Sequence, residues 1–327
     1  MKSVLQKITT LLLSCALVVP VASSAITLKR ASKTKFTYLL AGVDDAASNT
    51  DVLMLVTFDS ARSAGSVIQI PRDTYFESDG KTNKINHVYP SELQAGKTPR
   101  AAMESTAELI SDLFSVEIDG FVSVTTAAFR DFVDSIGGVL INMPAELEFF
   151  SGEQKISLKK GENLLDADTA LAFVRHRKSY PTADLGRLNA QKIFLDGLYY
   201  SATKRAGYDT LLSLVSNFGD GVVTNVSIID VLIMIFKHSS KFRDAVTTYL
   251  TLPGEPVEKG GVWYYVPNKI AATLALNTHV GCTGEFDSEM RLLDTRDEQM
   301  LGVYGRRKFR YPEYIKNDIN YVVTENG

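Results

Sequence analysis

Cysteine and histidine are scarce in this sequence. Its 327 residues include two cysteines and four histidines. Cys15 lies in an apolar segment near the N-terminus, and Cys282 lies in the loop-like sequence GCTGEF, which contains no histidine. If the N-terminal segment is removed, no internal disulfide is possible, so the hydrophobic core must stabilise the chain. Cysteine-based metal sites and a Cys/His catalytic pair are also disfavoured, because Cys282 would then be the one cysteine left.

A strong excess of one charge is also absent. The chain has 35 lysines and arginines against 38 acidic residues, a net charge of −3. This balance argues against a general polyanion-binding surface, and we expect no nucleic-acid partner. Local clusters of basic residues therefore indicate specific sites. The 45% hydrophobic content is enough for a substantial core.

The first 25 residues have the pattern of an export signal. Lys2 and Lys7 precede the apolar run LLLSCALVV, and VASSA ends in the small-x-small pattern that precedes cleavage, after Ala25. The run from Ile8 to Ile26 is also long enough to span a bilayer. We expect residues 1–25 to be a signal peptide or a membrane anchor, and the rest of the chain to work outside the cytoplasm.

Short apolar runs alternate with helical patterns along the chain. The runs rich in branched residues predict strands at Phe36–Val43, Asp51–Phe58, Ser66–Pro71, Phe121–Val124 and Val139–Met143. Helical periodicity predicts helices at Pro99–Phe114, Thr125–Ile136, Ala167–Val174, Asp184–Arg205 and Ser227–Phe236. This order predicts an α/β fold of α/β/α layers, with a central mixed sheet flanked by helices.

Three charged residues stand at predicted strand ends. Asp44 follows the first strand, Asp51 begins the second, and Arg72 follows the third. Ligands of open α/β sheets sit at the carboxyl ends of strands. Two carboxylates around a short loop would suit a hard cation such as Mg²⁺, although aspartates are also common turn and cap residues. Asp45, Asp73 and His176 are weaker candidates.

The stretch LAFVRHRKSYPTADLGRLNAQ concentrates arginines beside an apolar run. If a helix begins near Asp184, then Asp184, Arg187 and Gln191 share the face that begins its core-facing stripe. A guanidinium on an inward face usually meets a carboxylate, a phosphate or a ligand. The alternative is that Asp184 and Arg187 pair only with each other. If residues 175–177 are extended, His176 points away from Arg175 and Arg177.

Several motifs together resemble one known family. These are GVD, TDVLML, IPRDTY, KINHVY, FVDSIGGV, ALAFVRHR, DLGRLNAQ and LPGEPVEKGGVWYYVPN. In order and spacing they resemble the LytR-CpsA-Psr family of cell-wall glycopolymer ligases. The resemblance implies a single domain of this type over residues 36–280, followed by a polar C-terminal extension over residues 281–327.

The resemblance also implies an activity. Such an enzyme works on the outer face of the bacterial cytoplasmic membrane, anchored or secreted. It transfers a glycopolymer from a polyprenyl-pyrophosphate carrier to peptidoglycan through a phosphodiester. By position, Asp44 and Asp51 match magnesium-binding aspartates, and the remaining matches are arginines or polar site residues. Arg72, Arg175, Arg177 and Arg187 match pyrophosphate-binding arginines, and Asp184 and Gln191 match the other site positions.

Two positions depart from the family pattern. Members commonly have arginine where this chain has Asn49 and Ala190. Ala190 projects about 120° from Asp184, off the site face, so we expect arginine to be dispensable there. Asn49 removes a cation near the magnesium loop. Two alternatives to the transferase therefore stay open: a non-catalytic polyprenyl-phosphate-binding protein of envelope assembly, and a hydrolase of the lipid pyrophosphate.

Overall fold

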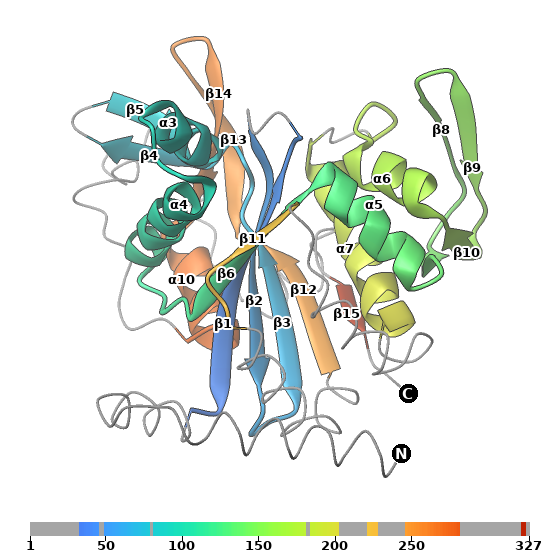
Figure 1. Ribbon diagram of the computed structural model, residues 1–327, viewed down its shortest axis with the longest axis horizontal. Helices are drawn as coiled ribbons and strands as arrows, with labels where there is room; N and C mark the ends of the chain where they lie inside the picture. Colours follow the sequence, from blue (N-terminus) through green and yellow to red (C-terminus); the bar gives the residue numbers. More distant parts are fainter. Residues whose placement is uncertain are drawn as a thin grey trace. The chain divides into compact units, whose positions relative to one another are not determined.

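A computed structural model of the chain describes residues 33–45, 49–78, 81–180, 184–202, 221–227, 246–281 and 322–324. The chain divides into two compact units, Met1–Lys35 and Phe36–Gly327, and the second holds the elements that follow (Figure 1). Within the described ranges no helix is long and apolar enough to cross a membrane. The prediction for residues 1–25 concerns residues outside these ranges and stays a prediction.

The centre of the second unit is a seven-stranded mixed sheet. Its strands, in spatial order, are β11 (Val222–Thr224), β6 (Gly120–Thr125), β1 (Lys35–Val43), β2 (Thr50–Asp59), β3 (Ala64–Gln69), β12 (Val246–Thr251) and β15 (Val322–Thr324). The pairs β1–β6 and β3–β12 are parallel, whereas β2–β3, β6–β11 and β12–β15 are antiparallel. The predicted α/β class with a central mixed sheet is confirmed.

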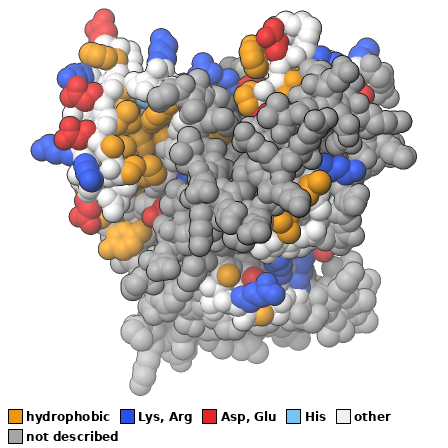
Figure 2. Space-filling model, turned by 180° about the vertical axis from the view of Figure 1, so that it is seen from behind, with side chains coloured by type: hydrophobic (Ala, Val, Ile, Leu, Met, Phe, Trp, Pro, Cys, Tyr) orange, Lys and Arg blue, Asp and Glu red, His pale blue; other side chains and the backbone are white. Residues whose placement is uncertain are grey.

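Alternation along the strands sends side chains to both faces of the sheet. In β1 every second residue is buried, and Leu39 and Ala41 belong to a large core cluster with α4 and α10. On the other face, Met54, Val67 and Tyr249 form a smaller cluster against which Leu195 of α7 packs. Helices thus cover both faces (Figure 1). Acidic and basic side chains are interspersed on the visible described surface (Figure 2), in line with the small net charge.

The helices begin where capping residues supply acceptors for the first backbone N–H groups. Thr98 caps α4 (Pro99–Phe114), Thr125 caps α5 (Thr126–Ser135), Asp166 caps α6 (Ala167–Arg175) and Asn268 caps α10 (Lys269–His279). The other helices are η2 (Ile85–His87), α3 (Val88–Gln94) and α7 (Asp184–Tyr200). The hydrogen bonds from Thr169 lower the pKa of the Asp166 carboxyl, as expected for a cap. The predicted helix Ser227–Phe236 lies almost wholly outside the described residues.

Among the described residues, four two-stranded ribbons surround the central sheet. They are β4 (Tyr75–Ser78) with β5 (Lys81–Lys84), β7 (Val139–Met143) with β10 (Gly161–Leu165), β8 (Leu147–Ser151) with β9 (Gln154–Leu158), and β13 (Gly254–Lys259) with β14 (Val262–Pro267). The predicted strand Val139–Met143 therefore exists, but it pairs outside the central sheet. With β8–β9, α5, α6 and α7 it builds a second hydrophobic cluster.

Candidate active site

Asp44, Asp51 and Arg72 lie at one end of the central sheet, where β1 and β3 end and β2 begins. Asp44 donates its backbone N–H to the carbonyl of Asn49 (3.4 Å), which brings the end of β1 beside the start of β2. The backbone N–H of Ile70 donates to the carbonyl of Leu53 (2.8 Å), which holds the end of β3 there as well. These three residues therefore lie together at the strand ends, as their positions in the sequence predicted.

Arg72 forms a charge-assisted hydrogen bond with Asp51. Its Nη1 lies 2.7 Å from Asp51 Oδ1, and its Nε lies 3.8 Å from Asp73 Oδ2. Asp73 also accepts a hydrogen bond from Lys84 Nζ at 3.0 Å. Two carboxylates therefore hold and orient the Arg72 guanidinium. Lys84 was not assigned from the sequence, although it begins the KINHVY motif.

Asp44 and Asp51 flank the connection between β1 and β2. Asp44 Oδ1 accepts the backbone N–H of Asn49 at 3.4 Å, and Asp51 supplies the second carboxylate. Among the described residues there is no group of three or more side chains able to hold a metal. Magnesium needs few protein ligands, because waters and substrate phosphates complete its shell. Asp44 and Asp51 would therefore supply oxygen donors of the kind that Mg²⁺ uses.

Asp45 has a local structural role. Its Oδ1 accepts the backbone N–H of Ala127, at 3.2 Å, in the first turn of α5. A carboxylate is favourable at a helix N-terminus, where backbone N–H groups lack partners within the helix. Asp45 thus ties the β1–β2 loop to α5.

Arg187 and Gln191 are both buried, at 6% and 4% exposure. They lie one turn apart on α7, which begins at Asp184 as the sequence predicted. The expectation of an inward-facing pair is confirmed for these two residues. The side chain of Asp184 lies outside the described set, so its predicted role stays a prediction.

Gln191 links two parts of the site through buried hydrogen bonds. Its Nε2 donates to the carbonyl of Val174 at 3.1 Å, and its Oε1 accepts from Gln69 Nε2 at 3.2 Å. Gln69 Oε1 in turn accepts from the hydroxyl of Thr251 at 3.2 Å. Val174 immediately precedes Arg175, and Gln69 lies three residues before Arg72. The chain of bonds therefore connects α6 to the edge of the sheet.

Ala190 lies on a different side of α7 from Arg187 and Gln191. Ala190 is 3% exposed and packs in the second hydrophobic cluster with Phe194. Most of α7 is buried, because α5, α6 and β7 cover the side that the central sheet does not. A single core-facing stripe therefore describes this helix incompletely. Position 190 lies off the face that carries Arg187 and Gln191, as expected, and arginine there would enter packed apolar surroundings.

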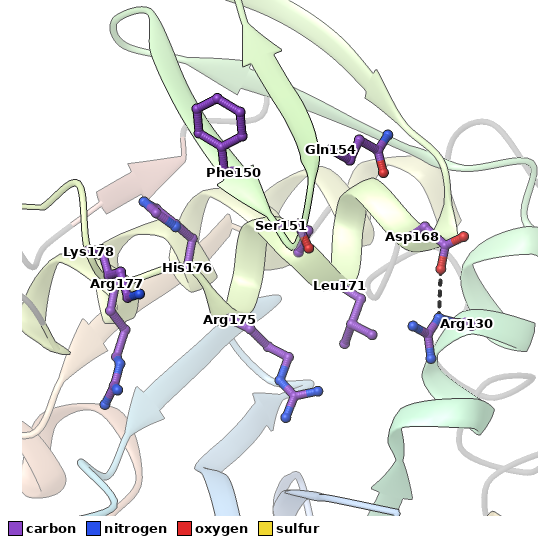
Figure 3. A pocket seen from close by; sticks show the side chains of 11 residues that line it. Arg130, Phe150, Ser151, Gln154, Asp168, Leu171, Arg175, His176, Arg177 and Lys178 are labelled. Carbon is purple, nitrogen blue, oxygen red and sulfur yellow. Dashed lines mark hydrogen bonds and ion pairs between the residues drawn. The ribbon is translucent and has the colours of Figure 1, made fainter.

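Arg175 and Arg177 extend to the same side of the chain, and His176 points to the other (Figure 3). Arg175 ends α6, and His176 has extended backbone angles (φ −65°, ψ 137°), so consecutive side chains alternate. The expectation that His176 points away from the two arginines is confirmed.

His176 packs into the fold. Its ring stacks on Phe149 with centroids 4.3 Å apart and meets the edge of Tyr180 at 5.4 Å. Its Nε2 accepts the backbone N–H of Ser179 at 3.0 Å. Burial, and secondarily the charge of Lys178, lower the pKa of His176. A neutral imidazole therefore anchors the segment that carries the two arginines.

A cleft of about 560 Å³ opens beside these arginines (Figure 3). It lies between α5, α6 and the β8–β9 hairpin. Its lining residues are Arg130, Phe150, Ser151, Gln154, Asp168, Leu171, Ala172, Arg175, His176, Arg177 and Lys178. The predicted site residues therefore lie in three places. Asp44, Asp51 and Arg72 are at the strand ends of the central sheet, Arg175 and Arg177 line the cleft, and Arg187 and Gln191 are buried on α7.

The sequence and the fold both match a known class of protein. The model of the LytR_cpsA_psr family matches residues 18–279, so the chain belongs to that family. The resemblance seen in the sequence motifs is therefore confirmed.

Two relatives carry the name of a teichoic acid transferase. The polyisoprenyl-teichoic acid–peptidoglycan teichoic acid transferase TagU of Bacillus licheniformis is 28% identical over 244 residues, covering 70% of this chain and 72% of that protein. TagU of Bacillus anthracis is 29% identical over 259 residues, covering 75% and 79%.

Solved structures show the same fold. The crystal structure of Bacillus subtilis TagV superposes with a TM-score of 0.63 at 25% identity, covering 77% of this chain and all of that one. A protein from Streptococcus agalactiae gives a TM-score of 0.66 at 18% identity, covering 84% and 97%. At that identity the second match bears on the fold alone.

Proposed function

We propose that this protein transfers a glycopolymer from a polyprenyl-pyrophosphate carrier to peptidoglycan. Membership of the LytR_cpsA_psr family and similarity to proteins named teichoic acid transferases support this activity. The observation that carries it is the paired arrangement of Arg72 with Asp51 at the sheet edge and of Arg175 with Arg177 at the cleft. A hydrolase or a non-catalytic binding protein is not favoured, because the named relatives are transferases.

In the proposed reaction, a hydroxyl of a peptidoglycan sugar attacks the phosphate that carries the glycopolymer. A new P–O bond forms, and the P–O–P bond to the carrier breaks. Polyprenyl phosphate leaves with the bond's electron pair, and the hydroxyl proton passes to a base or to water. Most of the protein's contribution to such a transfer is positioning and charge stabilisation.

The arginines supply that charge stabilisation. Arg72, Arg175, Arg177 and Arg187 would bind the pyrophosphate and neutralise the charge that develops on the leaving phosphate. Arg72 is already oriented by Asp51 and Asp73, which lowers the cost of ordering it when substrate binds. Gln191 would keep Arg175 in place through the carbonyl of Val174.

Magnesium is part of the proposal. Asp44 and Asp51 would hold it, and the ion would neutralise phosphate oxygens that the arginines do not reach. Asp51 would then serve both the ion and Arg72. Asp184 would orient Arg187 or accept the proton of the attacking hydroxyl.

The proposed setting is the outer face of the bacterial cytoplasmic membrane. The carrier lipid lies in that membrane, and the acceptor lies outside it. The export pattern of residues 1–25 supports this location, whether the segment is cleaved or retained as an anchor. We therefore propose the membrane surface as a further partner of the protein.

A transfer assay tests the proposal. The purified protein is incubated with a lipid-pyrophosphate glycan, with and without soluble peptidoglycan strands, and with Mg²⁺ or EDTA. We expect an acceptor-linked phosphodiester product that needs both acceptor and Mg²⁺. Release of free glycan at the same rate without acceptor would identify a hydrolase, and binding without turnover would identify a binding protein.

A further inference from the structure

Three ring side chains in contact connect β8 to the first turn of α7. Phe149 of β8 stacks on His176 with ring centroids 4.3 Å apart, and the edge of the Tyr180 ring meets His176 at 5.4 Å. The base of the Tyr180 side chain lies against Gly186 of α7. These contacts therefore join a hairpin, the segment that follows α6 and the start of α7.

The members of this row of contacts alternate with the site arginines along the chain. His176 lies between the two arginines that line the cleft, and Gly186 immediately precedes Arg187, which is buried on α7. Because Tyr180 contacts both His176 and Gly186, it links the backbone beside the cleft arginines to the backbone beside Arg187. Its ring therefore separates two groups of proposed phosphate-binding cations by a fixed distance.

Gly186 is needed for the close approach of Tyr180. The backbone of Gly186 is helical, a conformation open to every residue, so backbone freedom does not explain a glycine there. A Cβ added at Gly186 would collide with Cβ and Cγ of Tyr180. Alanine is the better residue inside a helix. The missing side chain of Gly186 thus serves the contact with Tyr180.

Local hydrogen bonds and packing order Tyr180. Its backbone N–H donates to the carbonyl of Arg177 at 3.1 Å, and the N–H of Ser179 donates to His176 Nε2 at 3.0 Å. The ring packs against the second hydrophobic cluster, which includes Phe149. The turn that follows Arg177 and the ring that ends it are therefore held in one arrangement.

The hydroxyl of Tyr180 takes no part in these contacts. It is buried and makes no hydrogen bond with any residue that the structure describes. Burial raises the pKa of Tyr180 to about 12, so the hydroxyl stays protonated near neutral pH and does not serve as a phenolate base. The ring is therefore the part of Tyr180 that connects the two groups of arginines.

We infer that Tyr180 is a positioning residue that sets the separation between the cleft arginines and Arg187, with Gly186 as its contact on α7. The inference rests on the proposed function, because it assumes that these arginines bind the two phosphates of one carrier. A pyrophosphate bound by both groups of arginines depends on their separation, whereas a monophosphate bound by one group does not. Loss of the Tyr180 ring should therefore act mainly on pyrophosphate binding.

Calorimetry on the full chain with farnesyl pyrophosphate and farnesyl monophosphate tests this role. We expect Tyr180→Gly and Gly186→Ala each to weaken pyrophosphate binding about tenfold and monophosphate binding about twofold or less. Tyr180→Phe keeps the ring and should bind both probes like the wild type. Tyr200→Ala is the matched control, because it removes a 45% exposed tyrosine at the far end of α7. It should leave both affinities unchanged.

A double variant tests the contact itself. Tyr180→Gly removes the atoms with which a methyl group at position 186 would collide. The double variant Tyr180→Gly/Gly186→Ala should therefore bind like Tyr180→Gly alone. If Gly186→Ala causes its full further loss in that background, the two residues act independently and the inference is overturned. Equal losses for the two probes, or a lower Tm with unchanged affinities, would indicate a purely structural role and would also overturn it.

The outcome for Tyr180 can be separated from the outcome for the proposed function. Both binding measurements are made without acceptor, so they can be made on a protein that transfers no glycan. The expected pyrophosphate selectivity in such a protein would support the role of Tyr180 and reject the transfer. Transfer with an unchanged KM for the lipid-linked donor in Tyr180→Gly would overturn the role of Tyr180 and leave the function standing.

Discussion

Asp51 has two roles in the proposed chemistry. It holds the guanidinium of Arg72 at 2.7 Å, and it is one of the two carboxylates proposed to bind Mg²⁺. Replacing Asp51 by alanine would remove a metal ligand and the partner of Arg72 together. Alanine substitution alone therefore cannot separate the two roles. The amide of asparagine keeps an acceptor for Arg72 and removes the negative charge that a metal needs.

We therefore predict that Asp51→Asn lowers the transfer rate at least about 100-fold and raises the Mg²⁺ concentration needed for half-maximal activity. Thermal unfolding should change little, because the side chain is partly exposed. Asp73→Asn is the control, since it loosens Arg72 and Lys84 without touching a proposed metal ligand. Its Mg²⁺ dependence should match that of the wild type. Wild-type activity that persists in EDTA would refute the metal assignment.

The arginines make a second prediction at the scale of single residues. Arg177→Ala and Arg187→Ala should weaken binding of a polyprenyl pyrophosphate about 10- to 100-fold, and of the monophosphate much less, because each guanidinium adds charge-assisted hydrogen bonds to the second phosphate. Arg100→Ala, in the exposed i,i+4 pair of α4, is the control. Equal losses for both lipids would indicate that these arginines support the structure or the lipid tail.

At the scale of elements, the buried bonds from Thr251 through Gln69 and Gln191 to Val174 join β12, β3, α7 and α6. The sequence suggested Gln191 as a substrate-binding residue. The structure shows that both ends of its amide are engaged by the protein. We therefore regard Gln191 as a positioning residue for Arg175. A positioning role predicts different effects of substitution than direct contact with the substrate would.

Gln191→Met keeps the volume of the side chain and removes both hydrogen bonds. We predict a loss of about 1–3 kcal/mol of stability, because two buried groups lose their partner, together with a higher KM for the pyrophosphate donor. Thr251→Val breaks the chain at its far end and leaves the bond to Val174 intact. It should cost similar stability without the change in KM. Identical kinetics for the two variants would show that the chain of bonds only stabilises the fold.

The segment between α6 and α7 supports a prediction about pH. Burial lowers the pKa of His176 in the folded protein, so the unfolded chain binds its proton more readily. The stability that His176 contributes is fully present above the unfolded pKa of about 6.5, and it is lost as pH falls through the lower folded value. His176→Phe keeps a ring against Phe149 and removes the titration. Between about pH 7.5 and 5, its Tm should fall less than that of the wild type, and parallel curves would contradict this account.

How much the sequence predicts depends on whether a feature is local. The helix Pro99–Phe114 was predicted with its observed bounds, because Thr98, Pro99 and the apolar spacing act within a few residues. The bond between Gln69 and Gln191 joins residues 122 apart, and no local pattern indicates it. The same holds for the pairing of Lys84 with Asp73 across a ribbon, and for the all-round burial of α7. Single-residue roles were predicted through motifs, whereas their partners required the fold.

At the scale of the whole molecule, the C-terminal extension contributes to the central sheet. The boundary predicted at residue 280 separates residues 281–327 from the domain. Yet Val322–Thr324 form β15, which pairs with β12 in antiparallel register, with Thr248 opposite Val323. An unpaired edge strand offers its backbone to other chains. The extension therefore covers an edge that the domain would otherwise present.

Removal of residues 282–327 should thus have two consequences. We predict a loss of about 1–2 kcal/mol from the missing backbone bonds, which lowers Tm by a few degrees, and faster aggregation through the exposed edge of β12. Val323→Pro is the matched variant in the full chain, since proline cannot donate a backbone hydrogen bond and is poorly tolerated within a pair of strands. It should reproduce part of both effects while keeping the rest of the extension. If the truncated chain loses stability and Val323→Pro does not, then contacts elsewhere in the extension, and not the β12–β15 pairing, stabilise the domain.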